Sequence, residues 1–161
     1  MIQRLGAITA LALLLAACQA TGQAGHVTDQ HTGLNMVHSQ RFAVANGLLH
    51  NLNAHAFHEE EIGFGVYYQY TATGVGWMFI NSAWSSGKKL RLARTKQDVL
   101  GCGGGSCSIQ ETGFILLTPE EFYRYAQTGF EFKLLGRNGE VVGKMPSHAF
   151  QQVIDRLAGR S

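Results

Sequence analysis

The stretch LTPEEFYRYAQTG, residues 117–129, constrains the fold most, because it contains a complete set of signals for one helix. Thr118 is the expected N-cap, Pro119 takes the first helical position and Glu121 completes a capping box. Phe122 and the apolar residues that follow it fall on one helical face, and Gly129 suits the C-terminal cap. The stretch therefore predicts a short amphipathic helix that packs one face on a flat partner.

A hairpin and a second helix are predicted directly after this helix. FEFKLLG and EVVGKM flank Arg137-Asn138-Gly139, and Asn-Gly between two extended runs is a strong hairpin signal. In PSHAFQQVIDRLAG, Pro146 begins a helical pattern with an apolar stripe, and Gly159 follows its last turn. Ser147 is interpreted as a helix-capping residue.

The segments before residue 118 read mainly as strands. FGVYYQY, residues 64–70, alternates between two faces, and VGWMFIN, residues 75–81, carries bulk on both faces like a central strand. Further candidate strands are residues 34–44, 48–57, 89–95 and 109–117, although residues 34–58 also permit some helix. We expect an α+β fold, with an antiparallel sheet of about six or more strands and two short helices near the C-terminus.

The N-terminus has the layout of a secretory signal peptide. Residues 1–17, MIQRLGAITALALLLAA, contain one basic residue, Arg4, then an apolar run and two small residues at the end. A transmembrane helix needs roughly 20 apolar residues, so the run is short for a membrane span. We interpret residues 1–17 as a targeting segment outside the folded domain.

LAAC, residues 15–18, resembles the lipobox of bacterial lipoproteins. The resemblance implies that Cys18 is acylated and becomes the first residue of the mature chain, which ties it stably to a membrane. Gln19 follows the cysteine, where an inner-membrane lipoprotein commonly has aspartate, so the resemblance implies the periplasmic face of the outer membrane in a Gram-negative host. The alternative is an ordinary cleaved signal that happens to precede a cysteine.

The remaining chain suits one domain. Residues 18–25 are expected to form the lipidated cysteine and a flexible tether, and residues 26–161 a single α+β domain. The net charge of +2 falls by one when Arg4 is removed, which argues against a nucleic-acid partner, and 45% hydrophobic residues argue against disorder. The body of the chain resembles small uncharacterised proteobacterial lipoproteins, a resemblance that implies no activity.

Cys102 and Cys107 enclose a glycine-rich loop, LGCGGGSC, that invites several interpretations. With Cys18 lipidated and the chain in an oxidising compartment, these two thiols are expected to form a disulfide across a turn. A Cys-x-x-Cys redox pair has two residues between its cysteines. A structural zinc site needs four ligands. A P-loop needs Gly-Lys followed by Ser or Thr after its glycines. The loop meets none of these requirements, so we interpret it as a stapled turn.

A histidine-rich segment offers a candidate metal site at His50, His55 and His58, next to three consecutive glutamates. Imidazole and carboxylate are good ligands for zinc or copper. HAFHE, however, lacks the spacing of the His-Glu-x-x-His motif, and a strand would point His55 and His58 to opposite faces. Exposed polar positions on a strand are the competing interpretation.

A basic strip, KKLRLARTK, offers a contact for anionic surfaces. Its charged residues are Lys88, Lys89, Arg91, Arg94 and Lys96, with no acidic residue among them. Such a strip next to a membrane can meet anionic head groups or polysaccharide. The alternative is an edge strand that charge protects from aggregation.

No catalytic constellation is visible in the sequence. Ser147 and His148 are neighbours in the chain, but a nucleophile and its base also need a third orienting group in space. The aromatic residues Trp77, Trp84, Tyr67, Tyr68 and Tyr70 fit a ligand groove or, more commonly, a core. No cofactor is expected.

The sequence thus predicts a non-enzymatic, membrane-anchored module that binds an unknown envelope protein or glycan through a sheet face or loops. The first alternative is a metal-binding lipoprotein that uses the histidine-rich segment. The second is a cell-envelope hydrolase whose site is assembled from residues distant in the sequence.

Overall fold

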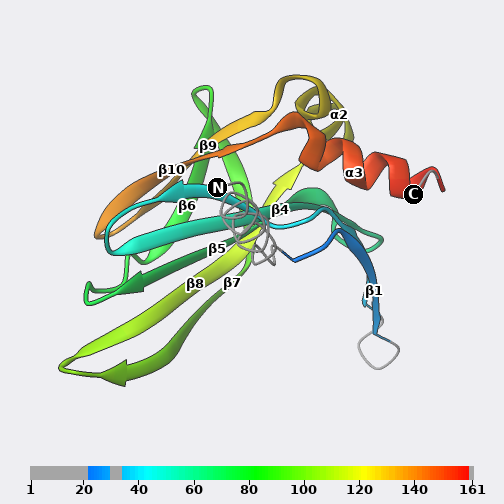
Figure 1. Ribbon diagram of the computed structural model, residues 1–161. Helices are drawn as coiled ribbons and strands as arrows, with labels where there is room; N and C mark the ends of the chain where they lie inside the picture. The colour runs from blue at the N-terminus through cyan, green and yellow to red at the C-terminus, as the bar shows by residue number, and fades with distance from the viewer. Residues whose placement is uncertain (1–21, 30–33, 160–161) are drawn as a thin grey trace, which may run out of the picture.

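The computed structural model describes residues 22–29 and 34–159, and these form an antiparallel sheet with two short helices (Figure 1). The predicted α+β fold class is confirmed. The strands are β1 (Gly25–Asp29), β2 (Leu34–His38), β3 (Phe42–Asn46), β4 (His50–Glu59), β5 (Gly63–Thr73), β6 (Ile80–Ser85), β7 (Lys88–Gly103), β8 (Ser106–Leu117), β9 (Phe130–Gly136) and β10 (Gly139–Met145). The helices are α2 (Pro119–Thr128) and α3 (Ser147–Leu157).

The strand order is β1-β2-β4-β5-β8-β7-β6-β9-β10, and β3 also pairs with β4, beside β2. The sheet bends so strongly that β9 and β10 lie over β4 and β5 as a second layer (Figure 1). A Cβ on Gly143 of β10 would lie 3.0 Å from Leu52 of β4, which places the two layers in direct contact. The bend therefore gives the sheet an enclosed inner face.

The core fills this inner face and continues under the helices. Along β4 and β5, alternate residues such as Leu52, Ala54, Val66 and Tyr68 are buried, as expected for strands with one covered face. At the helical end, Phe122 of α2 contacts the rings of Phe64, 4.7 Å away, and of Phe150 in α3, 5.0 Å away, between centroids. The helices thus close one end of the bent sheet.

Helix α2 begins and ends as the sequence predicts. The Thr118 side chain accepts a hydrogen bond from the backbone of Glu121, whose carboxylate accepts one from the backbone of Thr118. Gly129 ends the helix with a positive φ of 74°, and its amide donates to Tyr125. The capping box is therefore complete, and the predicted helix is confirmed.

The start of helix α3 differs from the prediction at one residue. Its N-cap is Pro146, in an extended conformation, and no side chain donates or accepts a capping hydrogen bond there. Ser147 is already the first helical residue, so the interpretation of Ser147 as a cap is wrong. Its hydroxyl lies one position too far along the chain to reach the amides that an N-cap serves.

The predicted strands form, with two exceptions: residues 34–44 divide into β2 and β3, with a break at residues 39–41, and residues 75–81 are mostly not a strand. Residues 34–58 are strands and turns without helix, and β9 and β10 form the predicted hairpin, in which Gly136 pairs with Gly139. Residues 76–79, in contrast, form an irregular loop, and β6 begins only at Ile80. The predicted central strand VGWMFIN is therefore wrong over most of its length.

A buried carboxylate explains this loop. Glu111 of β8 accepts hydrogen bonds from the backbone amides of Met78, Phe79 and Ile80, at 2.6, 3.0 and 2.8 Å. The amides of Arg137 and Asn138 donate to the loop carbonyls of Phe79 and Met78. The amides of residues 78–80 thus bind the Glu111 side chain, and the carbonyls of Met78 and Phe79 bind the β9–β10 turn. Residues 76–79 therefore form no strand ladder.

Candidate functional site

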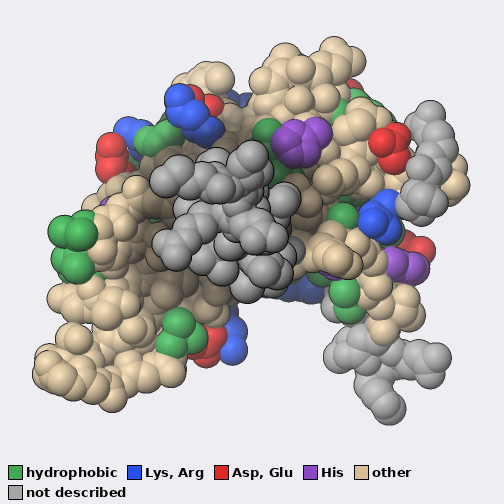
Figure 2. Space-filling view, in the orientation of Figure 1, with side chains coloured by type: hydrophobic (Ala, Val, Ile, Leu, Met, Phe, Trp, Pro, Cys, Tyr) green, Lys and Arg blue, Asp and Glu red, His purple; other side chains and the backbone are tan. Residues whose placement is uncertain are grey.

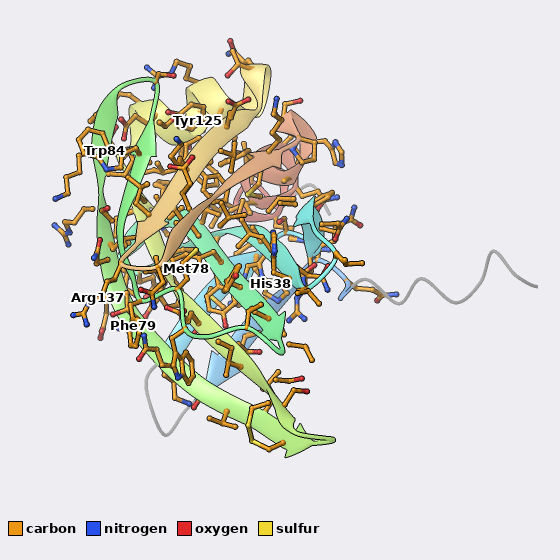
Figure 3. All side chains as sticks on the ribbon, turned by 90° about the vertical axis from the view of Figure 1, so that its left-hand side faces the viewer. His38, Met78, Phe79, Trp84, Tyr125 and Arg137 are labelled. Carbon is orange, nitrogen blue, oxygen red and sulfur yellow. A yellow bond between two sulfur atoms is a disulfide. The ribbon has the colours of Figure 1, made fainter. Side chains whose placement is uncertain are left out.

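A large cavity lies between helix α2 and the ends of β6, β9 and β10. Its volume is about 700 Å³, and charged side chains of both signs line it, among them Lys88, Glu121, Arg124 and Lys144. Figure 3 shows Trp84 and Tyr125 at this end of the molecule, whereas Met78, Phe79 and Arg137 lie further down. One residue of the predicted basic strip, Lys88, therefore belongs to the wall of this cavity.

Lys88 and Glu121 form an ion pair at the edge of this cavity. The distance from Lys88 Nζ to Glu121 Oε1 is 2.5 Å. Burial raises the pKa of Glu121, but hydrogen bonds from Lys88 and from the Thr118 backbone outweigh it and hold that pKa below its ordinary value. The carboxylate that caps helix α2 thus also fixes the position of the lysine.

A second cavity, of about 310 Å³, adjoins the same ion pair. Lys88 and Glu121 line both cavities, and the second one adds Lys89 and Arg91 of β7. We call the two cavities together with Lys88, Lys89, Arg91, Arg124 and Lys144 the basic groove. Helix α2 positions Arg124, β7 positions the three residues of the strip, and β10 positions Lys144.

The charges of the basic groove are only partly neutralised. Lys144 Nζ lies 2.9 Å from Glu131 Oε2, and the hydrogen bond from this lysine raises the pKa of Lys144. The Arg124 guanidinium lies 4.9 Å from the centroid of the Tyr125 ring. Among the described residues, Lys89, Arg91 and Arg124 have no acidic side chain within ion-pair distance, so the groove retains an excess of positive charge.

The face over β9 and β10 has a different character. On these strands Lys133 of β9 pairs with Glu140 of β10, and Lys144 of β10 pairs with Glu131 of β9. Figure 2 shows basic and acidic side chains interspersed at the upper left of the molecule. The basic and acidic side chains of these pairs on β9 and β10 neutralise each other. The excess of positive charge therefore belongs to the groove and not to this face.

The rest of the predicted basic strip lies outside the groove. Arg94 lies 3.4 Å from Glu59, and Lys96 lies 3.0 Å from Asp98. β7 pairs with β6 only over Lys88–Leu90, and from Arg91 onward no described strand lies on that side of it. The interpretation as a charged edge strand therefore fits this second part of β7.

The three histidines of the candidate metal site lie apart along β4. The ring of His50 stacks on Tyr70, that of His55 on Tyr67, and that of His58 contacts Phe64, with centroid distances of 5.7, 4.9 and 4.4 Å. In the part of the chain that the structure describes, no three His, Cys, Asp or Glu side chains are grouped to hold a metal ion. The structure does not bring these three imidazoles together.

The His55 ring contacts two other rings. Its ring packs between Tyr67 and His38, whose ring centroid is 5.3 Å away. Burial, with smaller contributions from nearby His38 and Arg41, lowers the pKa of His55 to about 3. His55 is therefore a neutral packing residue near neutral pH.

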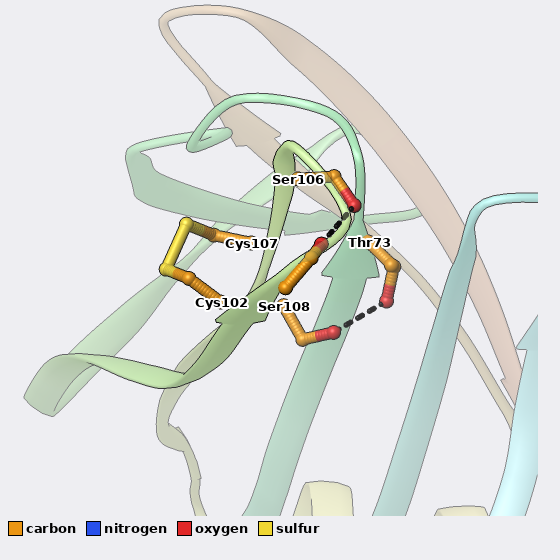
Figure 4. Close-up of a disulfide and its surroundings, with 6 residues drawn as sticks. Thr73, Cys102, Ser106, Cys107 and Ser108 are labelled. Atoms are coloured by element: carbon orange, nitrogen blue, oxygen red, sulfur yellow. Dashed lines mark hydrogen bonds between the residues drawn. A yellow bond between two sulfur atoms is a disulfide. The ribbon is translucent and has the colours of Figure 1, made fainter.

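The two cysteines form the predicted disulfide at the tip of the β7–β8 hairpin (Figure 4). Cys102 and Cys107 are direct cross-strand partners with Cα atoms 4.0 Å apart. The turn between them contains Gly104 and Gly105, both with positive φ, 58° and 82°. The interpretation of this loop as a stapled turn is confirmed.

The aromatic residues divide between the core and the surface. Tyr68 and Tyr70 are buried on the inner face, while Tyr67, Trp77 and Trp84 are partly exposed. The predicted neighbours Ser147 and His148 lie at the start of α3, where the His148 ring contacts Phe42 at 5.1 Å. Among the described residues, no hydrogen bond joins the Ser147 hydroxyl to a histidine or to a carboxylate.

Three residues of interest escaped the sequence interpretation: Glu111, Gln97 and Arg124. Glu111 alternates with Ile109 and Ile115 on the inner face of β8, so an acidic residue in an otherwise apolar register was the available signal. Gln97 donates a 3.3 Å hydrogen bond to the same carboxylate. Arg124 carried no signal beyond its exposed position on a predicted helix.

The predicted signal peptide and Cys18 lie outside the described residues. Gly22 and Ala24, at the end of the predicted tether, accept hydrogen bonds from Arg41 and Arg156, and Gly25 begins β1. Neither helix in the described ranges has the length and apolar run needed to cross a bilayer.

No protein-family model, no curated protein and no solved structure matches this chain.

Proposed function

We propose that this protein is a non-enzymatic lipoprotein, anchored by acylated Cys18 to the periplasmic face of the outer membrane, that binds an anionic envelope component through the basic groove. The observation that carries the proposal is the cavity of about 700 Å³ beside α2 with its neighbour, where Arg124, Lys89 and Arg91 have no acidic side chain within ion-pair distance among the described residues. The lipobox resemblance of residues 15–18 supports the anchor.

The groove suits an anionic ligand for physical reasons. Lys89 has a flexible ammonium group, and Arg91 and Arg124 have planar guanidinium groups, all of which donate hydrogen bonds. The concave shape of the groove strengthens the positive electrostatic potential at its opening. The Lys88–Glu121 pair fixes the centre of the groove, so a ligand meets a preformed surface. Carboxylate, phosphate and sulfate groups of an envelope polymer or lipid share the chemistry that these donors recognise.

Binding to vesicles tests the groove. The full chain in detergent-free nanodiscs is mixed with vesicles containing about one third phosphatidylglycerol, with purely zwitterionic vesicles, or with dextran sulfate as a soluble polyanion. We expect the double variant Lys89→Glu with Arg91→Glu to weaken binding to the anionic probes about tenfold or more, and salt to weaken the wild type similarly. Arg137→Glu, at the far end of the sheet, is the control, and it is compared with Lys89→Glu alone because these two single variants change the net charge equally.

Equal binding by the groove variant and the Arg137 control contradicts the role of the groove. The anchor has its own test, because Cys18→Ser is expected to leave the protein soluble or unprocessed. Full membrane fractionation of that variant contradicts the lipid anchor.

A further inference from the structure

A cavity of about 360 Å³ lies at the end of the bent sheet that faces away from the helices. Its wall consists of the start of β4, the last part of β5, the loop over residues 75–78 and the β9–β10 turn with the start of β10. Met78 belongs to this wall, and Figure 3 places Met78 well away from Tyr125, which lines the basic groove. The cavity shares no lining residue with the basic groove, so it is a separate site.

Three ring side chains line this cavity, those of His50, Tyr70 and Trp77. The His50 ring stacks on the Tyr70 ring, with 5.7 Å between their centroids and 30° between their planes. A Cβ on Gly47 would collide with the His50 ring, so this ring also packs against the Gly47 backbone. The Asn138 side chain donates a 2.8 Å hydrogen bond to the Trp77 carbonyl and ties the loop to the β9–β10 turn. The rings are therefore held in place by the protein before any ligand arrives.

Each of these rings carries a polar group that has no partner in the protein. Among the described residues, no hydrogen bond reaches the Trp77 indole N–H, the Tyr70 hydroxyl or the ring nitrogens of His50. The Tyr68 hydroxyl is the one fully enclosed side-chain polar atom without a partner in these ranges, so the groups of the three cavity rings retain contact with solvent. Tyr70 is otherwise 7% exposed, and the polar group of a buried tyrosine usually has a partner. A ligand with hydrogen-bonding groups of both kinds supplies these partners.

A neutral sugar ring has the chemistry that this wall recognises. The C–H groups of its faces are apolar and stack on aromatic rings, and its hydroxyl groups both donate and accept hydrogen bonds. A quaternary ammonium ion also binds aromatic rings, but it neither donates nor accepts hydrogen bonds and would leave the three polar groups unpaired. Glu140 lines the cavity and the buried Glu111 is the cross-strand partner of Tyr70, so negative charge disfavours an anionic ligand.

We propose that this cavity binds one neutral sugar unit of a glycan, which stacks on the Trp77 ring and exchanges hydrogen bonds with the polar groups of Tyr70 and His50. Ligand pockets commonly measure about 300–1,000 Å³, and this cavity lies near the lower end of that range, which suits a single sugar unit. The site depends neither on the basic groove nor on the lipid anchor, so the failure of either leaves it in place.

Tryptophan fluorescence tests the site, because the chain has two tryptophans and one of them lines the cavity. Trp84→Phe leaves Trp77 as the reporter at the cavity, and Trp77→Phe leaves Trp84 as the remote control. Each full-length protein, in a polyoxyethylene detergent that carries no sugar, is titrated with the trimer of N-acetylglucosamine or with maltotriose. We expect at least one of these neutral saccharides to change the Trp77 emission saturably, with half-saturation below about 5 mM, and to leave the Trp84 emission unchanged.

Two substitutions in the Trp84→Phe protein test the polar groups. Tyr70→Phe removes only a hydroxyl, and His50→Phe keeps a ring that can stack but has no nitrogen, so we expect each to weaken saccharide binding about fivefold. Tyr67→Phe, on the other face of the same strand and outside the cavity, is the matched control and should leave the affinity unchanged. Urea unfolding of each variant confirms that it is folded, and the comparison of Trp77 with Trp84 needs neither substitution.

Several results overturn the proposal. They are the absence of saturation by both saccharides up to about 50 mM, an equal response of Trp77 and Trp84, and an affinity that Tyr70→Phe and His50→Phe leave at the level of the Tyr67→Phe control. Choline chloride and sodium glucuronate are titrated in parallel. Tighter saturation by choline identifies a cation site, and tighter saturation by glucuronate identifies an anion site, so either result also overturns the proposal of a neutral sugar.

Discussion

Glu111 Oε2 accepts a 2.8 Å hydrogen bond from the backbone amide of Ile80, although their strands, β8 and β6, are not neighbours in the sheet. β7 lies between these two strands in the order of the sheet. One buried side chain therefore connects β8 to β6 where β6 and β7 separate, and no Lys or Arg of residues 22–29 and 34–159 forms an ion pair with it. The amides that it binds supply the compensating partial positive charge.

Removing this carboxylate should destabilise the protein strongly. In Glu111→Ala the amides of Met78, Phe79 and Ile80 lose their acceptor inside the protein, which should cost about 3 kcal/mol of unfolding free energy. Urea unfolding measures this loss, and Trp77 in the same loop should become more accessible to a fluorescence quencher. Glu140→Ala, which removes an exposed partner of Lys133, is the control and should stay within about 0.5 kcal/mol of wild type.

The loop is also held from its other side, where Gly136 permits a close approach. A Cβ on Gly136 would lie 2.2 Å from the carbonyl oxygen of Met78, so Gly136→Ala must displace the loop. We expect a loss of about 1–3 kcal/mol in the unfolding free energy. Gly76→Ala is the matched substitution, because its Cβ would meet nothing within 4 Å. Equal stability of the two variants in urea would contradict this account.

The fold was largely predictable because its signals are local. The capping box at Thr118 and Glu121 and the hairpin around Asn138 depend on residues a few positions apart, and the structure contains both. The alternation of side chains over residues 64–70 predicted a strand in the same way, and these residues lie in β5. Such patterns reflect local backbone geometry, which the tertiary contacts left intact at these elements.

The loop at residues 76–79 was not predictable, because its cause lies more than 30 positions away in Glu111. A short run of large apolar residues is expected both in a strand that is covered on both faces and in a loop that packs into the core, so the sequence does not distinguish them. The basic strip shows the same limit. Its cations were visible, but the pairing of Lys88 with Glu121 and of Arg94 with Glu59 depends on tertiary contacts, and these decide which charges remain available to a ligand.

Removing the disulfide should have a small and local effect. Replacing Cys102 and Cys107 by serine opens a very short loop, which the chain-entropy model values at about 2 kcal/mol. Because the cysteines lie at the tip of a hairpin, amide exchange should increase around residues 99–108 and stay unchanged in the helices. Exported wild-type protein should be lighter by two hydrogen atoms than its reduced form. Two free thiols in that material would contradict the prediction.

Acid should destabilise the protein through His55. Above pH 6.5 the ring is neutral in both the folded and the unfolded chain, so it makes no contribution to pH dependence. Between pH 6.5 and about pH 3, His55 is protonated in the unfolded chain but stays neutral in the folded protein, where its pKa is about 3. The free energy of unfolding therefore falls by about 1.4 kcal/mol for each pH unit in this range. Burial lowers the pKa of His58 as well, which adds a loss of the same sign.

Urea unfolding between pH 7 and pH 4 measures this slope. His55→Gln removes the titrating group, so we expect the variant to be less stable than wild type at pH 7 and to lose less stability on acidification. His148→Gln, an exposed histidine at the start of α3, should leave the slope in place. If both variants keep the wild-type slope, the acid sensitivity arises elsewhere. If His55→Gln alone flattens it, the packing of one neutral imidazole between Tyr67 and His38 sets the acid limit of the fold.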